Sequence, residues 1–429
     1  MRCIMDRING LFEFIKNSPD AYHAISSVKS MLDAEGYTEL YESEKWKLAV
    51  DGKYYVIRNG TSIIAFRTAR DARGFMICSS HSDSPSFRVK TTAESIGAYT
   101  RLEVEKYGGM IYYSWLDRPL CVAGRVVVRT PDGLESKLVD LDSDLLTIPS
   151  LAIHLNRGVN DGAKFNPAKD LLPLYSMNAD RGSLMNSIAE KIGVMAENIL
   201  SHDLFLYNRE QGRRIGKDGE FILCPRLDDL GCVYSSAVAF LESSAAASIP
   251  VLAVFDNEEV GSQTKQGADS TFLRDVLLRI TGSEISLCVA LENSFMVSAD
   301  NAHAKHPSYP EMSDPDNAPL LNGGLVIKYN ASQRYATDGL SDAFFRAVCS
   351  RADVKVQTYY NRADLPGGST LGSISDTNVS VPTVDIGLPQ LAMHSATETA
   401  GAYDVECMTK ALTEFYSSSI TKKGTKVYF

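Results

Sequence analysis

Apolar and polar positions follow one another along this chain in two periods, which together predict an α/β fold. Short apolar runs typical of buried strands recur between stretches where apolar residues return every three or four positions, as on one face of a helix. The runs predicted as strands are 53–58, 62–67, 74–78, 220–224, 249–255, 285–291 and 383–386. The predicted helices include one that begins at Ser18-Pro19, and others near 230–241, 272–280 and 403–415.

The pattern changes between about residues 92 and 217. This segment is typical of strands joined by tight turns, for example 125–129 and 134–139 on either side of Thr130-Pro131-Asp132-Gly133. It contains one helical pattern, which begins at Ser183. We therefore predict that an inserted domain, 92–218, interrupts a larger domain formed by 1–91 and 219–429.

Composition narrows the class of protein. The chain has 429 residues, 44% of them hydrophobic, and a formal net charge of -10, so it can bury a sizeable core but is a poor polyanion binder. Nucleic acid is not an expected partner. We also expect no membrane association and a cytoplasmic location, because the amino terminus lacks the apolar region of a signal peptide and no apolar run reaches membrane-spanning length. Eight scattered cysteines without a C-x-x-C motif predict reduced thiols: Cys3, Cys78, Cys121, Cys224, Cys232, Cys288, Cys349 and Cys407.

Polar residues that bind metals follow several of the strand-like runs. In open α/β sheets, ligands bind beyond the carboxyl ends of the strands, so residues distant in sequence can converge there. Each residue also has a simpler interpretation, because an isolated Glu-Glu pair is usually a solvated loop and a lone histidine is usually structural. The candidates are His81, Asp228, Glu258, Glu259, Asp300 and His394.

Two histidines and three carboxylates form a nitrogen and oxygen donor set suited to zinc, or to cobalt or manganese. If Asp228 bridges two metal ions, His81 with Asp300 completes one site, and Glu259 with His394 completes the other. Glu258 then stays unligated and free to carry a proton. In His81-Ser82-Asp83, the carboxylate of Asp83 is predicted to orient the imidazole.

This set predicts a dinuclear hydrolase with a two-metal hydroxide mechanism. Bound zinc lowers the pKa of water from about 15.7 toward ~7, so it generates the nucleophile, while a general base such as Glu258 typically contributes ~10²–10⁴-fold. Other catalytic signatures are absent from the sequence: it contains no G-x-S-x-G elbow, no H-E-x-x-H helix and no Walker loop.

Five segments, in this order, resemble the aspartyl aminopeptidase family of dinuclear zinc exopeptidases. The resemblance extends from about Ser18 to about Phe415. The segments are His81-Ser82-Asp83-Ser84-Pro85, Pro225-Arg226-Leu227-Asp228, Asp256-Asn257-Glu258-Glu259-Val260-Gly261-Ser262, Ser298-Ala299-Asp300-Asn301-Ala302-His303 and Pro389-Gln390-Leu391-Ala392-Met393-His394-Ser395.

The resemblance implies an α/β, zinc-exopeptidase-like catalytic domain with a central mixed sheet flanked by helices, interrupted by a β-rich oligomerisation domain. Twelve identical subunits would enclose a chamber. A histidine matching His154 would reach the active site of a neighbouring subunit, and a lysine matching Lys328 would lie close to an acidic substrate side chain. Asp229 departs from the asparagine of some relatives, which leaves the fine metal preference open.

The resulting expectation is an aminopeptidase that uses two divalent metal ions per subunit to remove Asp or Glu from the free amino terminus of peptides. An enzyme preferring neutral residues, or a related deacylase, remains an alternative, because members of the family differ in preference. A non-catalytic, self-assembling binding protein is the alternative outside enzymes, and a missing ligand would favour it. None of the five predicted ligands is missing.

Overall fold

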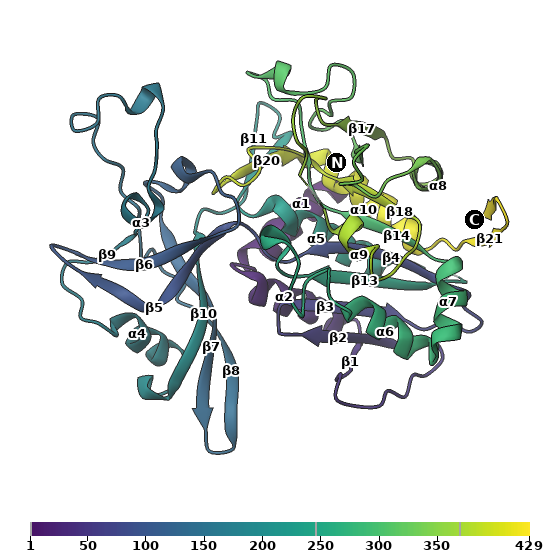
Figure 1. Ribbon diagram of the computed structural model, residues 1–429, viewed down its shortest axis with the longest axis horizontal. Helices are drawn as coiled ribbons and strands as arrows, with labels where there is room; N and C mark the ends of the chain where they lie inside the picture. The colour runs from purple at the N-terminus through teal and green to yellow at the C-terminus, as the bar shows by residue number, and fades with distance from the viewer. Residues whose placement is uncertain (1, 245–246, 369) are drawn as a thin grey trace.

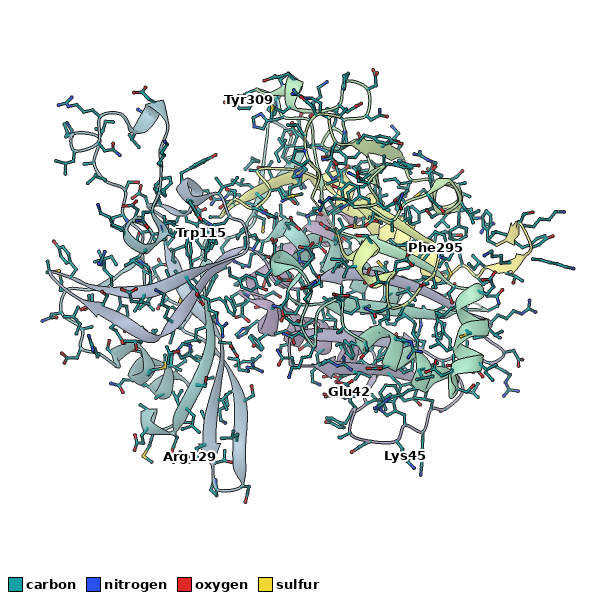
Figure 2. All side chains as sticks on the ribbon, in the orientation of Figure 1. Glu42, Lys45, Trp115, Arg129, Phe295 and Tyr309 are labelled. Atoms are coloured by element: carbon teal, nitrogen blue, oxygen red, sulfur yellow. The ribbon has the colours of Figure 1, made fainter. Side chains whose placement is uncertain are left out.

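The computed structural model describes residues 2–244, 247–368 and 370–429. It has a larger part with a wide sheet covered by helices and a smaller part dominated by long strands (Figure 1). Trp115, labelled in Figure 2, lies where the two parts meet, and Phe295 lies inside the larger one. Among the described residues, no helix is both long enough and apolar enough to cross a membrane.

A nine-stranded mixed sheet forms the centre of the larger part. Four neighbouring strands, β13, β4, β14 and β18, run parallel, and antiparallel pairs flank them on both sides. The order across the sheet is β1 (Thr38–Glu39), β2 (Lys53–Arg58), β3 (Ser62–Arg67), β13 (Ile249–Phe255), β4 (Phe75–His81), β14 (Phe295–Ala299), β18 (Thr383–Gly387), β16 (Leu325–Tyr329) and β17 (Val356–Tyr360).

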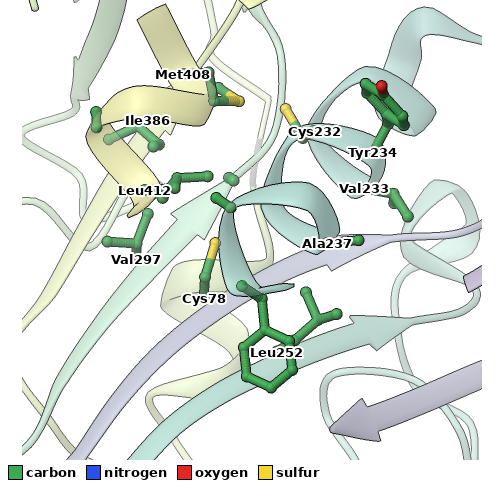
Figure 3. Close-up of a cluster of buried hydrophobic side chains, with 14 of the residues drawn as sticks. Cys78, Cys232, Val233, Tyr234, Ala237, Leu252, Val297, Ile386, Met408 and Leu412 are labelled. Atoms are coloured by element: carbon green, nitrogen blue, oxygen red, sulfur yellow. The ribbon is translucent and has the colours of Figure 1, made fainter. Parts of the chain in front are cut away.

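Helices cover both faces of this sheet, and alternate residues of each central strand pack against opposite layers. Leu252 and Val254 of β13 belong to one core cluster, while Val251 and Ala253 belong to another. The first layer consists of α1 (Arg2–Lys16), α2 (Ala21–Ala34), α5 (Leu227–Glu242), α8 (Gly339–Arg351) and α10 (Ala402–Tyr416). Figure 3 shows α5 and α10 packing over Cys78, Leu252 and Val297. The second layer consists of α6 (Phe272–Thr281), α7 (Glu284–Glu292) and α9 (Leu371–Ser375).

A five-stranded sheet lies beside the larger one and, as described below, supplies the rest of the candidate site. Its order is β11 (Arg213–Ile215), β12 (Phe221–Cys224), β20 (Glu398–Gly401), β19 (Pro389–Leu391) and β15 (Ala302–His303). A hairpin of β21 (Thr421–Lys423) and β22 (Lys426–Tyr428) follows α10. Short 3₁₀ helices are η1 (Tyr112–Trp115), η2 (Val159–Asp161), η3 (Ala196–Asn198), η4 (Glu258–Val260) and η5 (Pro310–Met312).

The smaller part is a six-stranded antiparallel sheet with its own hydrophobic core. Its order is β8 (Gly133–Asp140), β7 (Leu120–Thr130), β10 (Ile199–Asn208), β5 (Ser86–Ile96), β6 (Thr100–Tyr107) and β9 (Leu174–Ser176), and it carries α3 (Pro167–Asp170) and α4 (Ser183–Ile192). Strand β5 crosses the expected boundary at 91. Strand β11 lies before the expected boundary at 218, yet it pairs with β12.

The predicted strand over 285–291 is wrong, because these residues form α7. The side chain of Ser283 caps this helix by accepting a hydrogen bond from the backbone N–H of Ser286, at 3.1 Å. The helix carries apolar side chains on its solvent-facing side as well as its buried side, and Ile285 and Val289 are 80% and 63% exposed. An apolar run without a polar face has no period that distinguishes a helix from a strand.

The first predicted helix starts later than its sequence indicated. It begins at Ala21, and Asp20 rather than Ser18 is the capping residue. The carboxylate of Asp20 accepts hydrogen bonds from the backbone N–H groups of Tyr22 and His23, at 2.8 and 3.2 Å.

Candidate metal centre

Three neighbouring parallel strands of the nine-stranded sheet end at the candidate site. His81 is the last residue of β4, while Glu258 and Glu259 follow β13, and Asp300 follows β14. Strand β4 pairs with both neighbours, and Phe255 of β13 lies opposite His81. Because parallel strands end at the same edge of a sheet, this topology gathers the four side chains.

Asp228 and His394 follow strands of the five-stranded sheet, so two sheets position the candidate ligands. Asp228 follows β12, and His394 follows β19. A residue that the sequence interpretation missed, Glu398 of β20, links the two segments: its carboxylate accepts hydrogen bonds from the backbone N–H of Asp228 at 3.0 Å and of His394 at 2.7 Å. The only local signal was an acidic residue four positions after His394.

The candidate ligands fall into two groups that share Asp228. One contains His81, Asp228 and Asp300, and the other contains Asp228, Glu259 and His394. Asp229, which was not predicted as a ligand, also belongs to the first group. Its carboxylate accepts a hydrogen bond from the backbone N–H of His81 at 3.1 Å, so it fixes the position of that residue.

Distances within these groups match the spacing of ligands around a common ion. The Nε2 atom of His81 lies 3.5 Å from Oδ1 of Asp228, while Nε2 of His394 lies 3.5 Å from Oδ2 of Asp228 and 3.4 Å from Oε1 of Glu259. These separations exceed ordinary hydrogen-bond lengths. Ligands about 2.0–2.2 Å from a tetrahedral zinc ion are themselves separated by about 3.4 Å.

Unpartnered buried oxygens support the same interpretation. Oδ1 of Asp228 and Oε1 of Glu259 are buried and have no hydrogen-bond partner among the described residues. Buried carboxylate oxygens normally accept hydrogen bonds, and an unsatisfied one is costly unless it binds an ion. The donors present therefore fit divalent metal ions.

Both histidines are oriented for metal binding by main-chain carbonyls. Nδ1 of His81 lies 3.0 Å from the carbonyl oxygen of Asp83, and Nδ1 of His394 lies 2.8 Å from that of Gly109. Because a carbonyl only accepts, each Nδ1 carries the hydrogen, and each Nε2 lone pair is free for a metal.

The sequence predicted that the carboxylate of Asp83 orients the ring of His81, but in the structure the main-chain carbonyl of Asp83 makes this contact. The carboxylate lies farther away, with Oδ1 3.4 Å from Nδ1. It accepts hydrogen bonds from the backbone N–H groups of Glu258 and Glu259, at 3.1 and 3.2 Å. Asp83 thereby holds the turn that presents both glutamates.

Burial and mutual repulsion give the cluster unusual protonation equilibria. Burial, with Asp300, Asp83 and Asp228 nearby, raises the pKa of Glu258 to about 8. Burial also raises the pKa of Asp300 and Glu259. A divalent cation among these groups would favour their ionised forms.

Glu258 begins η4, directly after Asn257, whose left-handed φ of 64° turns the chain two residues beyond the end of β13. It belongs to a group with His81 and Glu259 but to neither group that contains Asp228. His81 and Glu259 belong to different donor groups, so a carboxylate beside both of them is well placed for a proton carrier.

The two predicted substrate-binding residues lie in different environments. Lys328 is buried, and its ammonium donates to the carbonyl oxygens of Asp300 and Asn301, at 2.8 and 3.3 Å. His154 is exposed in the segment between β8 and η2, and belongs to none of the metal-binding groups found among the described residues. The exposed apolar side chains of Leu151 and Leu155 lie close to it in sequence.

A three-layered α/β domain with two overlapping donor groups at its strand ends defines a metal-dependent hydrolase. Residues 14–416 match the family described as "Aminopeptidase I zinc metalloprotease (M18)". The chain is 44% identical to a "Probable M18 family aminopeptidase 2" of Clostridium novyi, covering 95% of this chain and 98% of the relative, and 40% identical to one of Pseudomonas paraeruginosa, covering 96% and 98%.

Solved structures agree with this assignment. The chain matches the "Cryo-EM structure of the Ape4 and Nbr1 complex" with a TM-score of 0.94 and 35% identity, covering 97% of this chain and 86% of that one. It matches the "mApe1 dodecamer" of S. cerevisiae with a TM-score of 0.85 and 26% identity, covering 95% and 96%. The chain belongs to the M18 family of zinc aminopeptidases, hydrolases that act on peptide bonds.

Proposed function

We propose that the enzyme removes an amino-terminal Asp or Glu from peptides and uses two divalent metal ions per subunit, zinc by preference and cobalt or manganese as alternatives. The position of Asp228 carries the two-metal part of this proposal, because its two oxygens face different imidazoles at equal distances of 3.5 Å. A carboxylate so placed is suited to bridging two ions. The preference for acidic residues rests on the resemblance to aspartyl aminopeptidases.

The proposed roles of the residues follow from their positions. His81, Asp228 and Asp300 would hold one ion, and Asp228, Glu259 and His394 the other. Such ions supply Lewis acidity that activates water and polarises a peptide carbonyl. Glu258 takes a proton from the attacking water and returns it to the leaving amine, while Asp83 keeps the Glu258 turn in place through its backbone hydrogen bonds.

A substrate panel tests the proposed specificity. Protein stripped of metal and then reloaded with zinc, cobalt or manganese is assayed with aspartyl, glutamyl and leucyl anilides, and its metal content is measured. We expect two ions per chain and faster cleavage of the acidic substrates. A preference for the leucyl substrate contradicts the acidic specificity, and full activity without metal contradicts the mechanism.

Two neighbouring substitutions separate the proton carrier from a ligand. Glu258→Gln is expected to lower kcat by ~10²–10⁴-fold while two ions remain bound. Glu259→Gln is expected to lose one ion, because it removes a ligand charge. The opposite pattern of metal loss would mean that the roles of the two glutamates are exchanged.

Assembly is proposed to complete the site. A dodecamer is solved for the mApe1 relative, and the exposure of His154 together with Leu151 and Leu155 supports contact with another subunit. His154→Ala and Glu258→Gln subunits are each expected to be inactive alone. If His154 acts across an interface, dissociating the two variants and reassembling them as a mixture restores activity. In the mixed assembly, a Glu258→Gln subunit supplies an intact His154 to a neighbour whose Glu258 is intact. Inactive mixed assemblies would argue against a shared site.

A further inference from the structure

One short segment at the end of β6, Tyr107-Gly108-Gly109, contacts the metal centre from the inserted sheet. None of these residues is among the candidate ligands, and all three contact groups that carry or support those ligands. The contacts reach both halves of the centre. They give the inserted sheet a role beyond any part in assembly.

Tyr107 supports the turn that carries the two glutamates. Its hydroxyl donates to Oδ2 of Asp83 at 2.7 Å and accepts from Nδ2 of Asn257 at 2.8 Å. Burial and the Asp83 and Asp256 carboxylates raise the pKa of Tyr107 far above its usual value of 10.0, so the hydroxyl keeps its proton. Asp83 in turn receives the backbone N–H groups of Glu258 and Glu259. The tyrosine therefore holds both sides of the turn.

Gly109 and its neighbour hold the second histidine. The carbonyl oxygen of Gly109 lies 2.8 Å from Nδ1 of His394. Two residues later, the backbone N–H of Ile111 donates to the carbonyl oxygen of His394 at 2.9 Å. The segment thus fixes the ring of this candidate ligand, and Ile111, two residues beyond it, fixes the main chain.

Gly108 allows the segment to approach Glu259. Its φ is +75°, in the left-handed region, and an added Cβ would lie 3.2 Å from Cβ and 3.4 Å from Oε2 of Glu259. Any side chain here would press on the glutamate as well as strain the backbone. A glycine therefore satisfies two requirements at this position.

We propose that Tyr107 and Gly108 are positioning residues through which the inserted sheet sets the geometry of the metal centre. This inference rests on the metal ligands of the proposed function. Tyr107 acts through Asp83 on the turn bearing Glu258 and Glu259, and Gly108 acts by leaving room for Glu259. Groups that orient metal ligands typically change metal affinity by about 10–100-fold when removed.

The test measures Co²⁺ binding to the chelator-stripped full-length protein by visible absorption, with a competing chelator. Tyr107→Phe keeps the aromatic contact with Phe205, whose ring centroid lies 5.4 Å away, and removes only the hydroxyl. Tyr22→Phe is its control, because Tyr22 and Tyr107 line one cavity, and the Tyr22 hydroxyl donates to the carboxylate of Asp203 at 3.1 Å and not to Asp83. We expect Tyr107→Phe to weaken Co²⁺ binding about tenfold or more, and Tyr22→Phe to leave it unchanged.

Gly108→Ala has an equally close control in Gly36→Ala. Gly36 has nearly the same φ, +76°, but an added Cβ there meets nothing within 4 Å. Both substitutions strain the backbone, so the contacts of the added Cβ distinguish them: at Gly108 it would meet Glu259 at 3.2 Å and, at ordinary van der Waals distance, the Cα of Pro85 at 3.4 Å. We expect Gly108→Ala alone to weaken Co²⁺ binding and alter the absorption spectrum.

Wild-type affinity in both Tyr107→Phe and Gly108→Ala would overturn the inference, as would an equal loss in the control variants. Failure of the proposed function has a different signature: the wild-type protein itself would take up fewer than two Co²⁺ ions per chain. That result would remove the metal assignment and this inference with it.

Discussion

Replacing Lys328 with methionine is expected to destabilise the protein strongly. Lys328 is 2% exposed, and its ammonium donates to two carbonyl oxygens and lies 3.7 Å from the carboxylate of Asp300. Although burial lowers the pKa of this lysine, the carboxylates of Asp300 and Asp385 and the phenol of Tyr335 raise it above its usual value, so the ammonium stays charged. Methionine fills a similar volume but supplies neither the hydrogen bonds nor the charge.

The magnitude follows from the groups left behind. Removing one partner of a buried ion pair costs about 3–5 kcal/mol, because the other charge stays buried without compensation. Here the Asp300 carboxylate loses its cation, and two carbonyls lose a donor. A pair with an exposed lysine provides the comparison. Lys410 is 54% exposed and lies 3.4 Å from Glu406, a buried carboxylate that also pairs with Arg7 at 2.6 Å. Because Arg7 still compensates Glu406 when Lys410 is removed, that loss is expected to cost about 0–1 kcal/mol.

Urea unfolding of metal-free Lys328→Met, Lys410→Met and wild-type protein, at one subunit concentration, measures these differences without a contribution from metal affinity. The ratio of kcat/KM for aspartyl and leucyl anilides measures the proposed contact of Lys328 with an acidic substrate, independently of its effect on stability. If Lys328→Met unfolds at the wild-type urea concentration and only the aspartyl KM rises, the ammonium faces the substrate, and the reasoning from Asp300 is wrong.

Three further changes have defined outcomes. Chelation is expected to lower the melting temperature, because it leaves the buried carboxylates of the site without cations; an unchanged melt would contradict the metal assignment. Burial lowers the pKa of His23, but the carboxylate of Asp20, 2.7 Å away, raises it more, so the net pKa lies above 6.5. The ion pair therefore stabilises the fold fully below pH 6.5, and this stabilisation is lost as the pH rises through the pKa of His23 in the folded protein. His23→Gln should flatten that part of the unfolding free energy measured against pH. Gly74→Ala should lower the urea midpoint, because its Cβ would lie 2.0 Å from the carbonyl oxygen of Asn293.

The sequence predicted those parts of the fold whose pattern is local. Strands β2 and β3 occupy the predicted residues 53–58 and 62–67, because each is a short run with apolar side chains to bury. The candidate ligands were also identifiable, since each follows such a run. Helix α7 was not, because an apolar run exposed to solvent carries no periodic signal.

The supporting residues of the site had no local signal. Glu398 joins Asp228 to His394 only because β12 and β20 pair in a sheet. Tyr107 pairs with Ser86 in the β5–β6 ladder, and its hydroxyl reaches Asp83 in the segment that precedes β5. Both contacts depend on pairing between strands that are distant in sequence, which spacing along the chain does not encode.

Backbone conformation at the ligands leads to the same conclusion. Three residues at the site adopt left-handed φ values: Arg226 at 56°, Asn257 at 64° and His394 at 65°. Arg226 lies two residues before Asp228, Asn257 lies directly before Glu258, and His394 is itself a candidate ligand. Such conformations cost about 1–3 kcal/mol each and persist where surrounding contacts impose them. Here those contacts come from distant elements: Arg226 donates to a carbonyl of α1, Asn257 to Tyr107, and the ring of His394 faces the carbonyl of Gly109. The ligands can therefore be named from sequence, but their geometry exists only after the three sheets and α1 have assembled.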